Sequence, residues 1–580
     1  MQFGKVAAPL EFGGVFMEEQ RSAHGIPFPL SDAALDKAAL ASELSSVIAQ
    51  SEALLLQGRP REAEQLLRQC LARKRSEPAI ISALVRVLLA QERAQDGLGL
   101  IDNYCAATDS PAPPILLQRA QILLEMGHLK EAIAAFHHAI AAAPGNGVAH
   151  LGLAVALGQD GQSHAANASA QAAIAKGLDN AGSRSVLARS FFEMRQYDEA
   201  EAEFHRTLMH KPWDTAAHSA LAELIWMRTR DIRAALAEID RAVRQFRDAR
   251  ALDLQVVRAR IMRIANCHVE AKEELERLIS SNPNHLTLRI MAAQTSIDMD
   301  AARAALHAEH AMRLAPSHAG VAGLYADTML ATGRPEVAAN IAERLLTANP
   351  HDNHAIALQT ASWRLLDDPR YRPFHDYESL VQACMLDVPD GWSDLDHYLS
   401  DLAEDLRHEH ALLAEPVDQS VRRGTQVEHR VTETLMPAIR ALPKAIHGPI
   451  DRYMNRLRIG DTPWHRRATG NYRLNGLWSV RLQPHGHHVN HFHGKGWISS
   501  ACYIEVPEAV NNGDKQGWLK FGEPGLITQP ALSPDYFVRP VPGMLVLFPS
   551  WMWHGTVPFT SATEEHRLTM AFDVVPVAAV

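Results

Sequence analysis

The sequence predicts a multidomain α + β protein, in which a long solenoid of stacked helix pairs precedes a small antiparallel β-barrel or jelly roll with flanking helices. Two observations support this fold class. Prolines and glycines recur about every 34 residues through the first two thirds of the chain, as they do in helical repeats. After about residue 477, short segments rich in β-branched and aromatic residues alternate with Gly, Pro and Asn, which is typical of antiparallel strands.

Seven prolines mark the period most directly. Their residue numbers differ successively by 33, 33, 68, 71, 33 and 34, so 68 is two steps of 34 and 71 is two steps with a small insertion. Gly127 and Gly161 are also 34 residues apart, and they stand where a first helix must end. Each proline stands where a second helix cannot continue. The prolines are Pro78, Pro111, Pro144, Pro212, Pro283, Pro316 and Pro350.

Each repeat unit reads as helix, tight turn, helix, because apolar residues recur at helical spacing on both sides of the turn, as in residues 122–136. A single helix pair cannot bury its own apolar face, so neighbouring pairs are expected to stack. The pattern resembles the tetratricopeptide repeat family over residues 45–365, in about nine units, some of them degenerate. That resemblance implies a protein or peptide partner on the concave face of the solenoid. A structural spacer or a dimerisation module is the alternative.

Composition narrows the function classes. With a formal net charge of −10, the chain lacks the basic surface that non-specific nucleic-acid binding needs, so no nucleic-acid partner is expected. The five cysteines form no C-x-x-C pair, which argues against a zinc knuckle or a disulfide framework and favours a reducing cytoplasm. Glu11 and Glu18 interrupt any apolar signal segment, and no run of 18 apolar residues predicts a membrane span. We therefore expect a cytoplasmic protein without membrane contact.

The 34-residue period stops near Pro369, and the residues that follow read as a junction with helices that support the barrel. Helices are predicted over residues 392–412 and 427–458. The segment between them, 415–426, is too polar for a core and too poor in glycine for a phosphate loop, so it is predicted to be a loop. The resulting domains are an N-terminal extension at 1–44, the repeat solenoid at 45–365, the junction at 366–476 and the barrel core at 477–580.

The predicted barrel contains six strands. Gly543 after Pro542 marks a tight turn that leads into a fully apolar strand, and similar turn residues separate the others. The strands are predicted at residues 478–483, 497–506, 517–521, 535–539, 544–548 and 567–575.

Three histidines give this region a candidate metal site. His491 and His493 are two residues apart, so on an extended chain both side chains point to the same face and both imidazoles can reach one point. His554 follows about 60 residues later, beyond an apolar strand. A local histidine pair with one distant histidine is the spacing of a facial iron site on a double-stranded β-helix. Such a site uses about three protein ligands and leaves the other positions open for a co-substrate and O₂.

A basic residue follows these histidines on the next predicted strand. Arg567 comes 13 residues after His554, and Thr569 lies two residues further on, on the same face of the strand. A guanidinium group in this place could bind a dicarboxylate through two hydrogen bonds. Arg567 and Thr569 are therefore candidates for binding an acidic co-substrate.

The motifs around these residues resemble a known family. Residues 488–503, with residues 548–551 and His554, are similar to the bacterial 2OG-Fe(II) oxygenases that often follow tetratricopeptide repeats, and residues 419–426 resemble the upstream segment of that family. The resemblance covers about residues 374–580. It implies a dioxygenase that uses Fe(II) and 2-oxoglutarate, with ascorbate as an optional further cofactor. Such an enzyme converts 2-oxoglutarate to succinate and oxidises a second substrate, here by hydroxylation.

The resemblance also implies roles for single residues. His491 and His554 match the iron-binding histidines of the family, and Arg567 matches the residue that binds the distal carboxylate of 2-oxoglutarate. Tyr503 is a second candidate contact to that co-substrate. His493 stands where many such enzymes have Asp or Glu. Both a three-histidine site and a two-histidine site with His493 as a supporting neighbour are therefore open.

Two other functions fit the same sequence. One is a non-catalytic repeat scaffold with a degenerate barrel, and the presence of His491, His554 and Arg567 speaks against it. The other is a cupin-like metalloenzyme with zinc or manganese that does not use 2-oxoglutarate; the position of Arg567 after His554 favours the oxygenase. For the substrate, a tethered solenoid favours a polypeptide over a small metabolite, because attachment raises the local concentration of whatever the solenoid binds.

Overall fold

The described residues of the computed structural model are 32–73, 77–412, 414, 419–429, 434, 436–457, 462, 464–561 and 565–577. Most of the predicted N-terminal extension, including Glu11 and Glu18, lies outside them. The chain divides into two compact units between Ala217 and His218, and each unit is considered by itself. None of the described helices is long and apolar enough to cross a membrane.

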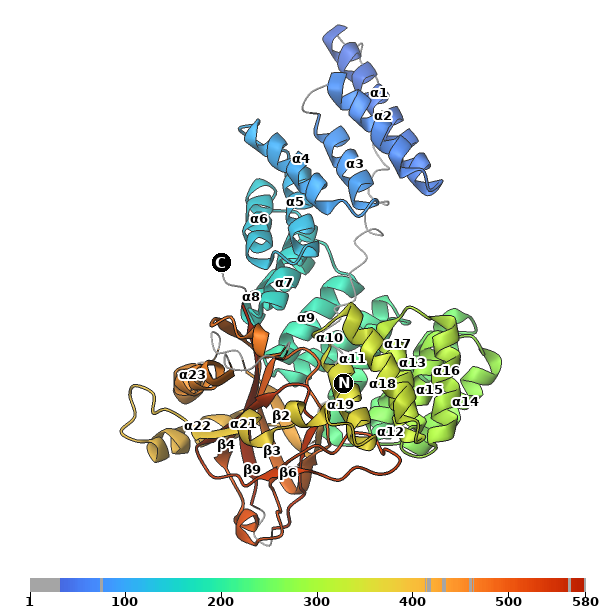
Figure 1. Cartoon of the computed structure of the whole chain (residues 1–580). Coiled ribbons are helices and arrows are strands. Elements are labelled where there is room, and N and C mark those ends of the chain that lie inside the picture. The colour runs from blue at the N-terminus through green and yellow to red at the C-terminus, as the bar shows by residue number, and fades with distance from the viewer. Residues whose placement is uncertain are drawn as a thin grey trace. The chain divides into compact units, whose positions relative to one another are not determined.

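The described part of the N-terminal unit is helical, and its helices pack in consecutive pairs (Figure 1). Small and apolar residues at helical spacing fill the spaces between them, as Ala132, Ala135, Phe136 and Ala139 do on α6. The helices are α1 (Asp32–Leu56), α2 (Pro60–Arg73), α3 (Pro78–Leu89), α4 (Ala94–Ala106), α5 (Pro113–Glu125), α6 (Leu129–Ala142), α7 (Gly147–Asp160), α8 (Ser163–Ala175), α9 (Ala181–Glu193) and α10 (Tyr197–His210).

The first helix of several pairs ends at a residue whose backbone has the left-handed conformation. Gly127 between α5 and α6 has a φ of 76°, and Gly161 at the end of α7 has a φ of 91°. These are the turn positions that the repeat period predicts, and glycine adopts this conformation without the steric cost that a Cβ brings. Arg195, one period after Gly161, takes the same conformation with a φ of 61°. The repeat geometry therefore overrides the conformational preference of that residue.

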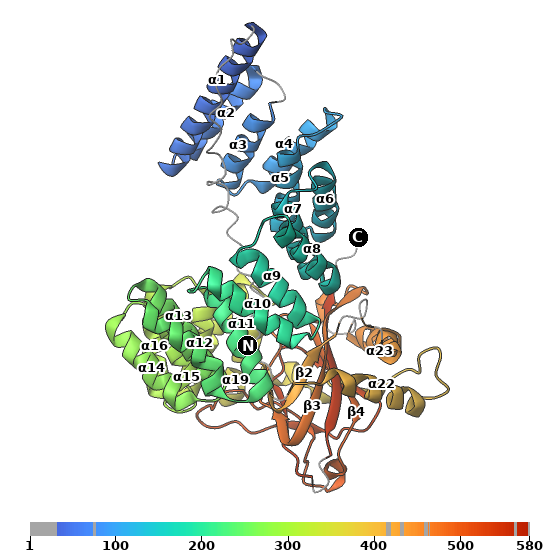
Figure 2. The same ribbon diagram turned by 180° about the vertical axis from the view of Figure 1, so that it is seen from behind.

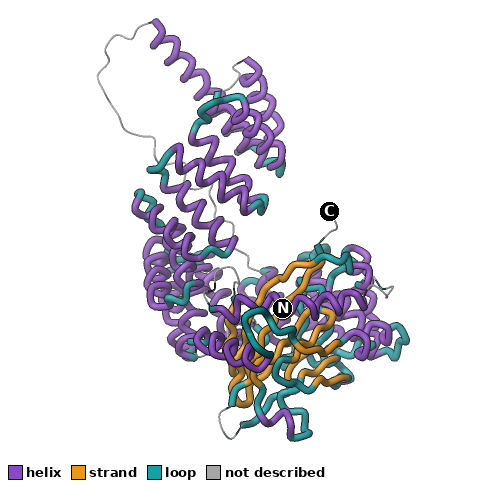
Figure 3. The backbone as a smooth tube through the Cα atoms, turned by 90° about the vertical axis from the view of Figure 1, so that its left-hand side faces the viewer, coloured by secondary structure: helices purple, strands orange, loops and turns teal. Residues whose placement is uncertain are grey.

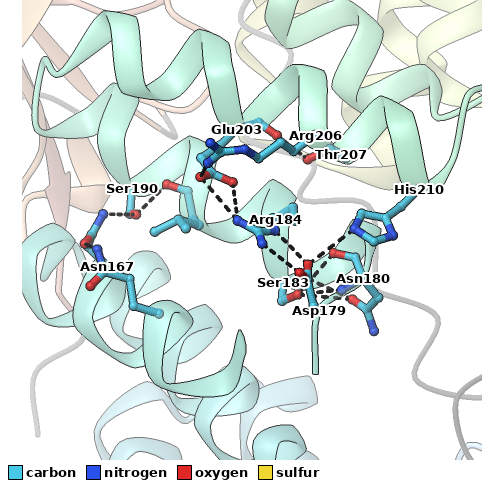
Figure 4. A network of polar contacts seen from close by, with 12 residues as sticks. Asn167, Asp179, Asn180, Ser183, Arg184, Ser190, Glu203, Arg206, Thr207 and His210 are labelled. Atoms are coloured by element: carbon cyan, nitrogen blue, oxygen red, sulfur yellow. Dashed lines mark hydrogen bonds and ion pairs between the residues drawn. The ribbon is translucent and has the colours of Figure 1, made fainter. Parts of the chain in front are cut away.

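Polar side chains join neighbouring helices of this unit (Figure 4). Arg184 of α9 donates from Nε and Nη2 to the two carboxylate oxygens of Asp179 at 2.7 Å each, and its Nη1 lies 3.1 Å from Oε2 of Glu203 on α10. Asn167 of α8 donates to the Ser190 hydroxyl of α9 at 3.0 Å. Because Glu203 is only 5% exposed, this ion pair is buried within the unit.

The helix pairs continue through the second unit, where Figure 3 shows the helices in purple and the strands in orange. Pro283, Pro316 and Pro350 each lie two residues beyond the end of a second helix, as the period predicts. The helices are α11 (Thr215–Thr229), α12 (Ile232–Gln245), α13 (Ala249–Ile264), α14 (His268–Ser281), α15 (Leu286–Ser296), α16 (Ala301–Leu314), α17 (Ala319–Ala331), α18 (Pro335–Ala348) and α19 (Asn353–Leu365).

The junction is built from short helices, two strands and two longer helices. The helix predicted at 392–412 is present as α22. The elements are α20 (Tyr371–Phe374), α21 (Tyr377–Leu380), β1 (Gln382–Met385), α22 (Leu395–Glu409), β2 (Val421–Glu428) and α23 (Pro437–Leu457).

Two predictions for this junction are wrong. The loop predicted at 415–426 is a strand from Val421 onward, because β2 pairs antiparallel with a neighbouring strand from Val421 to Glu428. The helix predicted at 427–458 begins only at Pro437. The sequence misleads here because Arg422 and Gln426 of β2 line a cavity instead of a hydrophobic core, so the strand does not look apolar.

The remaining strands complete two antiparallel sheets. One has six strands in the order β1-β7-β4-β9-β3-β2, and the other has three in the order β6-β5-β8. The last strand in sequence, β9, lies near the centre of the larger sheet, between β4 and β3. The six predicted strands all overlap observed ones, whereas β1, β2 and β8 were not predicted. The bounds are β3 (Tyr472–His488), β4 (Ile498–Glu505), β5 (Leu519–Phe521), β6 (Tyr536–Val538), β7 (Met544–Pro549), β8 (His554–Thr556) and β9 (Arg567–Pro576).

Within the second unit, the last repeat helices pack directly against the strand region (Figures 1 and 2). Arg364 of α19 donates from Nη1 to the carbonyl oxygen of Gly522 and from Nη2 to that of Ser533, at 2.9 Å each. The backbone N–H of Gln529 donates to the carbonyl oxygen of Leu330 on α17 at 3.0 Å. The repeats of this unit are therefore hydrogen-bonded to the loops that surround the sheets.

Candidate metal centre and adjoining cavity

Backbone pairing brings the three predicted metal-binding histidines together. His491 and His554 form an antiparallel bridge, with N–O distances of 2.8 Å and 2.9 Å in the two directions. The backbone N–H of His493 donates to the carbonyl oxygen of Ser550 at 2.8 Å. Two segments far apart in sequence are thus held side by side, with His554 at the start of β8.

The ring nitrogens of these histidines converge. Nε2 of His491 lies 3.2 Å from Nε2 of His493, and one ligand atom from each of the three rings lies within 4.8 Å of the others. Nδ1 of His491 lies 2.8 Å from the carbonyl oxygen of Val489, and Nδ1 of His554 lies 2.9 Å from that of Met552. A carbonyl oxygen only accepts hydrogen bonds, so each Nδ1 carries the proton and each Nε2 keeps a lone pair that can bind a metal.

The third histidine is oriented by a carboxylate. Nδ1 of His493 lies 2.6 Å from Oδ1 of Asp573 on β9, and the Ser499 hydroxyl donates to the same oxygen at 2.7 Å. A metal-binding histidine commonly donates its second N–H to a carboxylate in this way, which fixes the ring and raises its basicity. Asp573 was not predicted as a site residue, because an aspartate inside an apolar strand carries no motif of its own.

Burial favours the neutral form of two of the rings. Burial lowers the pKa of His491 well below its ordinary value, and the neighbouring His554 lowers it further. Burial, followed by the neighbouring His493, lowers the pKa of His554 in the same direction. Both imidazoles are therefore neutral at neutral pH, which is the form that binds metals.

The predicted co-substrate residues lie close by. Arg567 is 2% exposed, donates from Nη1 to the Thr556 hydroxyl at 2.8 Å, and lies 4.9 Å from the centroid of the Tyr503 ring. Among the described residues, neither Nε of Arg567 nor the Tyr503 hydroxyl has a hydrogen-bond partner, although both are buried. Burial raises the pKa of Tyr503, so its hydroxyl stays protonated. Unpartnered buried polar atoms are costly, and here they offer donors to an acidic ligand.

A cavity of about 320 Å³ adjoins these groups. The three histidines, Arg567 and Thr569 line it, whereas Tyr503 is outside the lining and packs beside Arg567. The opposite wall comes from repeat helices and the turns next to them, through Arg263, His268, Asp298, Asp327 and His354.

The repeat residues of this wall were not predicted, because a helix face that lines a cavity has the same spacing as one that lines a core. His488 was also given no role. Its Nδ1 lies 2.8 Å from the Ser420 hydroxyl, and burial, followed by Arg567, lowers its pKa to about 3. His488 is therefore neutral and contributes a polar side chain to the lining of the cavity.

Comparison with known protein families gives one match in the helical repeats and one in the strand region. Residues 476–573 match the family model described as "Putative 2OG-Fe(II) oxygenase", and residues 113–146 match the tetratricopeptide repeat model. No curated protein matches the sequence. The matched oxygenase region contains all three histidines, Asp573 and the Arg567 site.

Solved structures similar to the chain are repeat proteins. A tetratricopeptide repeat protein from Parabacteroides merdae is 18% identical, with 50% of this chain and 99% of that chain covered and a TM-score of 0.34. A thermophilic repeat protein from Thermus thermophilus is 21% identical, with 31% and 98% covered and a TM-score of 0.27. The chain therefore contains a segment similar to a tetratricopeptide repeat at residues 113–146 and a C-terminal segment similar to the 2OG-Fe(II) oxygenase family at residues 476–573.

Proposed function

We propose that the protein is an Fe(II)- and 2-oxoglutarate-dependent dioxygenase that hydroxylates a substrate recruited by its repeats. One observation carries this proposal: three histidine Nε2 atoms converge at the edge of a cavity in which a buried arginine has an unpartnered Nε. Metal-binding nitrogens and a carboxylate-binding cation in one cavity are the two parts that an iron and keto-acid site needs.

We assign the metal to His491, His493 and His554. The fixed Nδ1 protons of all three rings support this assignment, because they leave Nε2 as the free ligand atom in each. His493 is then a ligand and Asp573 its supporting carboxylate, so we favour the three-histidine arrangement over the two-histidine one. The chemistry that Fe(II) supplies when bound is the activation of O₂, coupled to decarboxylation of 2-oxoglutarate.

We assign the distal carboxylate of 2-oxoglutarate to Arg567. Its Nε and the Tyr503 hydroxyl are donors without partners among the described residues, and Thr556 holds Nη1 so that the guanidinium is fixed in the cavity wall. Thr569 lines the same wall and adds a hydroxyl. A planar guanidinium with a fixed orientation binds a carboxylate through two hydrogen bonds and discriminates against monoanions that cannot reach it.

The finer parts of the architecture are proposals on the same basis. We propose that the two antiparallel sheets are those of a double-stranded β-helix with its core at residues 477–580, to which β1 and β2 of the junction at 366–476 add strands, and that the solenoid at 45–365 precedes the junction. Tetratricopeptide repeats generally bind proteins or peptides, so we propose a polypeptide partner on the concave face, in a cytoplasmic protein without membrane or nucleic-acid partners. Ascorbate stays a prediction of the sequence resemblance.

A second candidate follows from the ligand set itself. All three ligands are histidines, and three neutral imidazoles also suit zinc. A three-histidine metalloenzyme that does not use 2-oxoglutarate would leave Arg567 without a keto acid to bind, so the unpartnered guanidinium atom favours the dioxygenase.

An anaerobic titration tests the proposal. Fe(II) and then 2-oxoglutarate are added to the purified chain, and the visible charge-transfer band of a chelated keto acid is recorded. We expect a band in the natural chain, no band in His554→Ala, and at least about tenfold more 2-oxoglutarate needed in Arg567→Ala, since a hydrogen bond to a charged group contributes about 1.5–3 kcal/mol. Arg473→Ala removes an exposed arginine of β3 and is the matched control.

Two outcomes would contradict the proposal. A folded, iron-loaded chain without the band would reject 2-oxoglutarate as the co-substrate, and metal analysis of the purified protein would then decide for or against the zinc enzyme. An equal 2-oxoglutarate requirement in Arg567→Ala and Arg473→Ala would reject the assignment of the carboxylate.

A further inference from the structure

We infer that the last repeats are part of the metal centre itself, because Asn353 and His354 of α19 hold the segment His491–Gly496 in its metal-binding geometry. This inference rests on the proposed metal site. It assigns the repeats a role beyond recruiting a partner: they position ligands. Two independent contacts carry it, one to the backbone of the segment and one to the side chain between the two histidines.

The first contact is made by the side-chain amide of Asn353, which is 1% exposed. Its Nδ2 donates to the carbonyl oxygens of His493 and Gly496, both at 2.7 Å. An amide nitrogen has two protons, so these two bonds use its whole donor capacity. The two acceptors lie on either side of Gly494 and Lys495, so one side chain fixes the turn that directly follows His493.

The start of α19 is itself held in place. The Asp352 carboxylate caps the helix by accepting from the backbone N–H groups of His354 and Ala355, at 3.0 Å and 3.2 Å. Such a cap stabilises a helix end and reduces fraying. Asn353 therefore donates from a fixed position, so its two hydrogen bonds hold the turn after His493 at a fixed place relative to α19.

The second contact is aromatic. The His354 ring stacks on Phe492 with centroids 5.3 Å apart and an interplanar angle of 16°, and Phe492 also makes a T-shaped contact with Trp553, with centroids 4.8 Å apart and an interplanar angle of 89°. Phe492 lies between His491 and His493, and Trp553 precedes His554. The ring of His354 therefore steadies residues that adjoin all three histidines.

His354 is also held by residues of the repeats. Its Nε2 lies 3.2 Å from Oδ1 of Asp327 on α17, and Asp327 is 3% exposed. On the same helix, Gly323 leaves room for the ring: a Cβ added there would lie 2.8 Å from Cε1 and Nδ1 of His354. The aromatic contact thus depends on two residues of α17, Gly323 and Asp327, neither of which is a proposed metal ligand.

The test compares two contacts of the same helix. Asn353→Asp keeps the shape of the side chain but replaces the donor with an acceptor, and an aspartate in the first turn suits a helix N-terminus. Arg364→Gln is the control on the same helix, because Arg364 also donates to two backbone carbonyls, those of Gly522 and Ser533, and pairs with Asp535, all outside the segment His491–Gly496. The whole chain is titrated with Co(II) alone, and the visible absorption gives both the affinity and the coordination geometry.

We expect Asn353→Asp to bind Co(II) at least about tenfold more weakly and with an altered spectrum, since loss of a supporting partner typically costs ten- to a hundredfold in metal affinity. Arg364→Gln is expected to stay within about twofold of the natural chain, with an unchanged spectrum. Gly323→Ala is a second variant: it favours the helix but displaces His354. We expect its loss of Co(II) affinity to be smaller than that of Asn353→Asp and larger than that of Arg364→Gln.

The outcomes separate this inference from the proposed function. If the natural chain binds neither Co(II) nor Fe(II), the metal site fails and the inference fails with it. If the natural chain binds Co(II) but Asn353→Asp binds equally well, only the inference is overturned. Equal losses in Asn353→Asp and Arg364→Gln would also overturn it, because they would indicate a general loosening of the contact between repeats and sheets.

Discussion

The two sets of helical repeats share a period but differ in where their buried polar groups find partners. In the N-terminal unit, Arg184, Glu203 and Asn167 bond to other repeat residues, so the helices satisfy one another. In the second unit, Asp327 and His354 pair in the same way, but Asn353 and Arg364 bond to backbone carbonyls of the strand region. A few polar side chains, rather than the period, therefore decide whether a repeat is self-contained or serves another domain.

Truncation of the chain is expected to have the largest effect on Co(II) affinity, and it tests whether the repeats of the second unit serve the strand region. We expect a fragment of residues 215–580 to bind Co(II) within about threefold of the whole chain, because it retains the entire second unit. A fragment of residues 366–580 lacks Asn353, His354 and one wall of the cavity. We expect its Co(II) affinity to fall at least about a hundredfold, at the upper end of the cost of losing supporting residues.

Calorimetry of the two fragments is the control for folding. A fragment of residues 366–580 that unfolds cooperatively and binds Co(II) as well as residues 215–580 would show that the strand region is self-contained. The contrast between the two sets of repeats would then have no functional meaning.

A change inside the N-terminal unit should affect stability and leave the metal site unchanged. Glu203→Ala removes the buried partner of Arg184, which keeps Asp179 as its second partner. We expect a loss of about 2 kcal/mol in the free energy of unfolding of that unit, below the full cost of breaking a buried ion pair. Glu199→Ala on the exposed first turn of α10 is the control, and Co(II) affinity should be unchanged in both variants.

The carboxylate behind His493 offers a smaller, local test. Asp573→Asn preserves the shape of the side chain but weakens the bond to Nδ1, and we expect about tenfold weaker Co(II) binding, equivalent to about 1.4 kcal/mol. Asp405→Asn is the matched control, since that carboxylate accepts from the backbone N–H of Ala438 and is outside the cavity lining. Unchanged affinity in Asp573→Asn would support a site in which His493 is not a ligand.

The smallest expected effect is a pH dependence confined to the second unit. Burial, followed by Arg364, lowers the pKa of His375 to about 3 from an ordinary 6.5. Below pH 6.5 the unfolded chain takes up a proton that the folded chain does not. This contribution is therefore fully present above pH 6.5 and is lost progressively as pH falls towards 3.

A variant isolates that contribution. His375→Phe keeps an aromatic ring against Tyr371, with which His375 stacks at 4.2 Å, and removes the titrating group. We expect the natural chain to lose about 1 kcal/mol more than the variant in free energy of unfolding between pH 7 and 5.5. Parallel stability curves for the two proteins would show that His375 does not carry the dependence.

The periodic features of the fold could be predicted from sequence. Helices end at or near Gly127, Pro283 and Pro350 because glycine readily takes the left-handed conformation and proline cannot continue a helix. Both residue types can be read directly from the sequence. The pair His491 and His493 could be predicted for the same reason, since two residues on an extended chain share a face.

The rest could not be predicted because its meaning depends on distant neighbours. β2 looks like a loop because Arg422 and Gln426 line a cavity, and only its pairing with β3 identifies it as a strand. Asn353 looks like an ordinary helix-start residue, yet it reaches carbonyl oxygens 140 and 143 residues further along the chain. Such long-range hydrogen bonds leave no periodic or local signal.

The position of β9 has a consequence for synthesis. The strand that joins β3 to β4 is made after both of them, and it carries Arg567, Thr569 and Asp573. Until it emerges from the ribosome, β3 and β4 each present an open edge to which other chains could add. A nascent chain that stalls before Arg567 should therefore be prone to aggregation and unable to bind metal tightly.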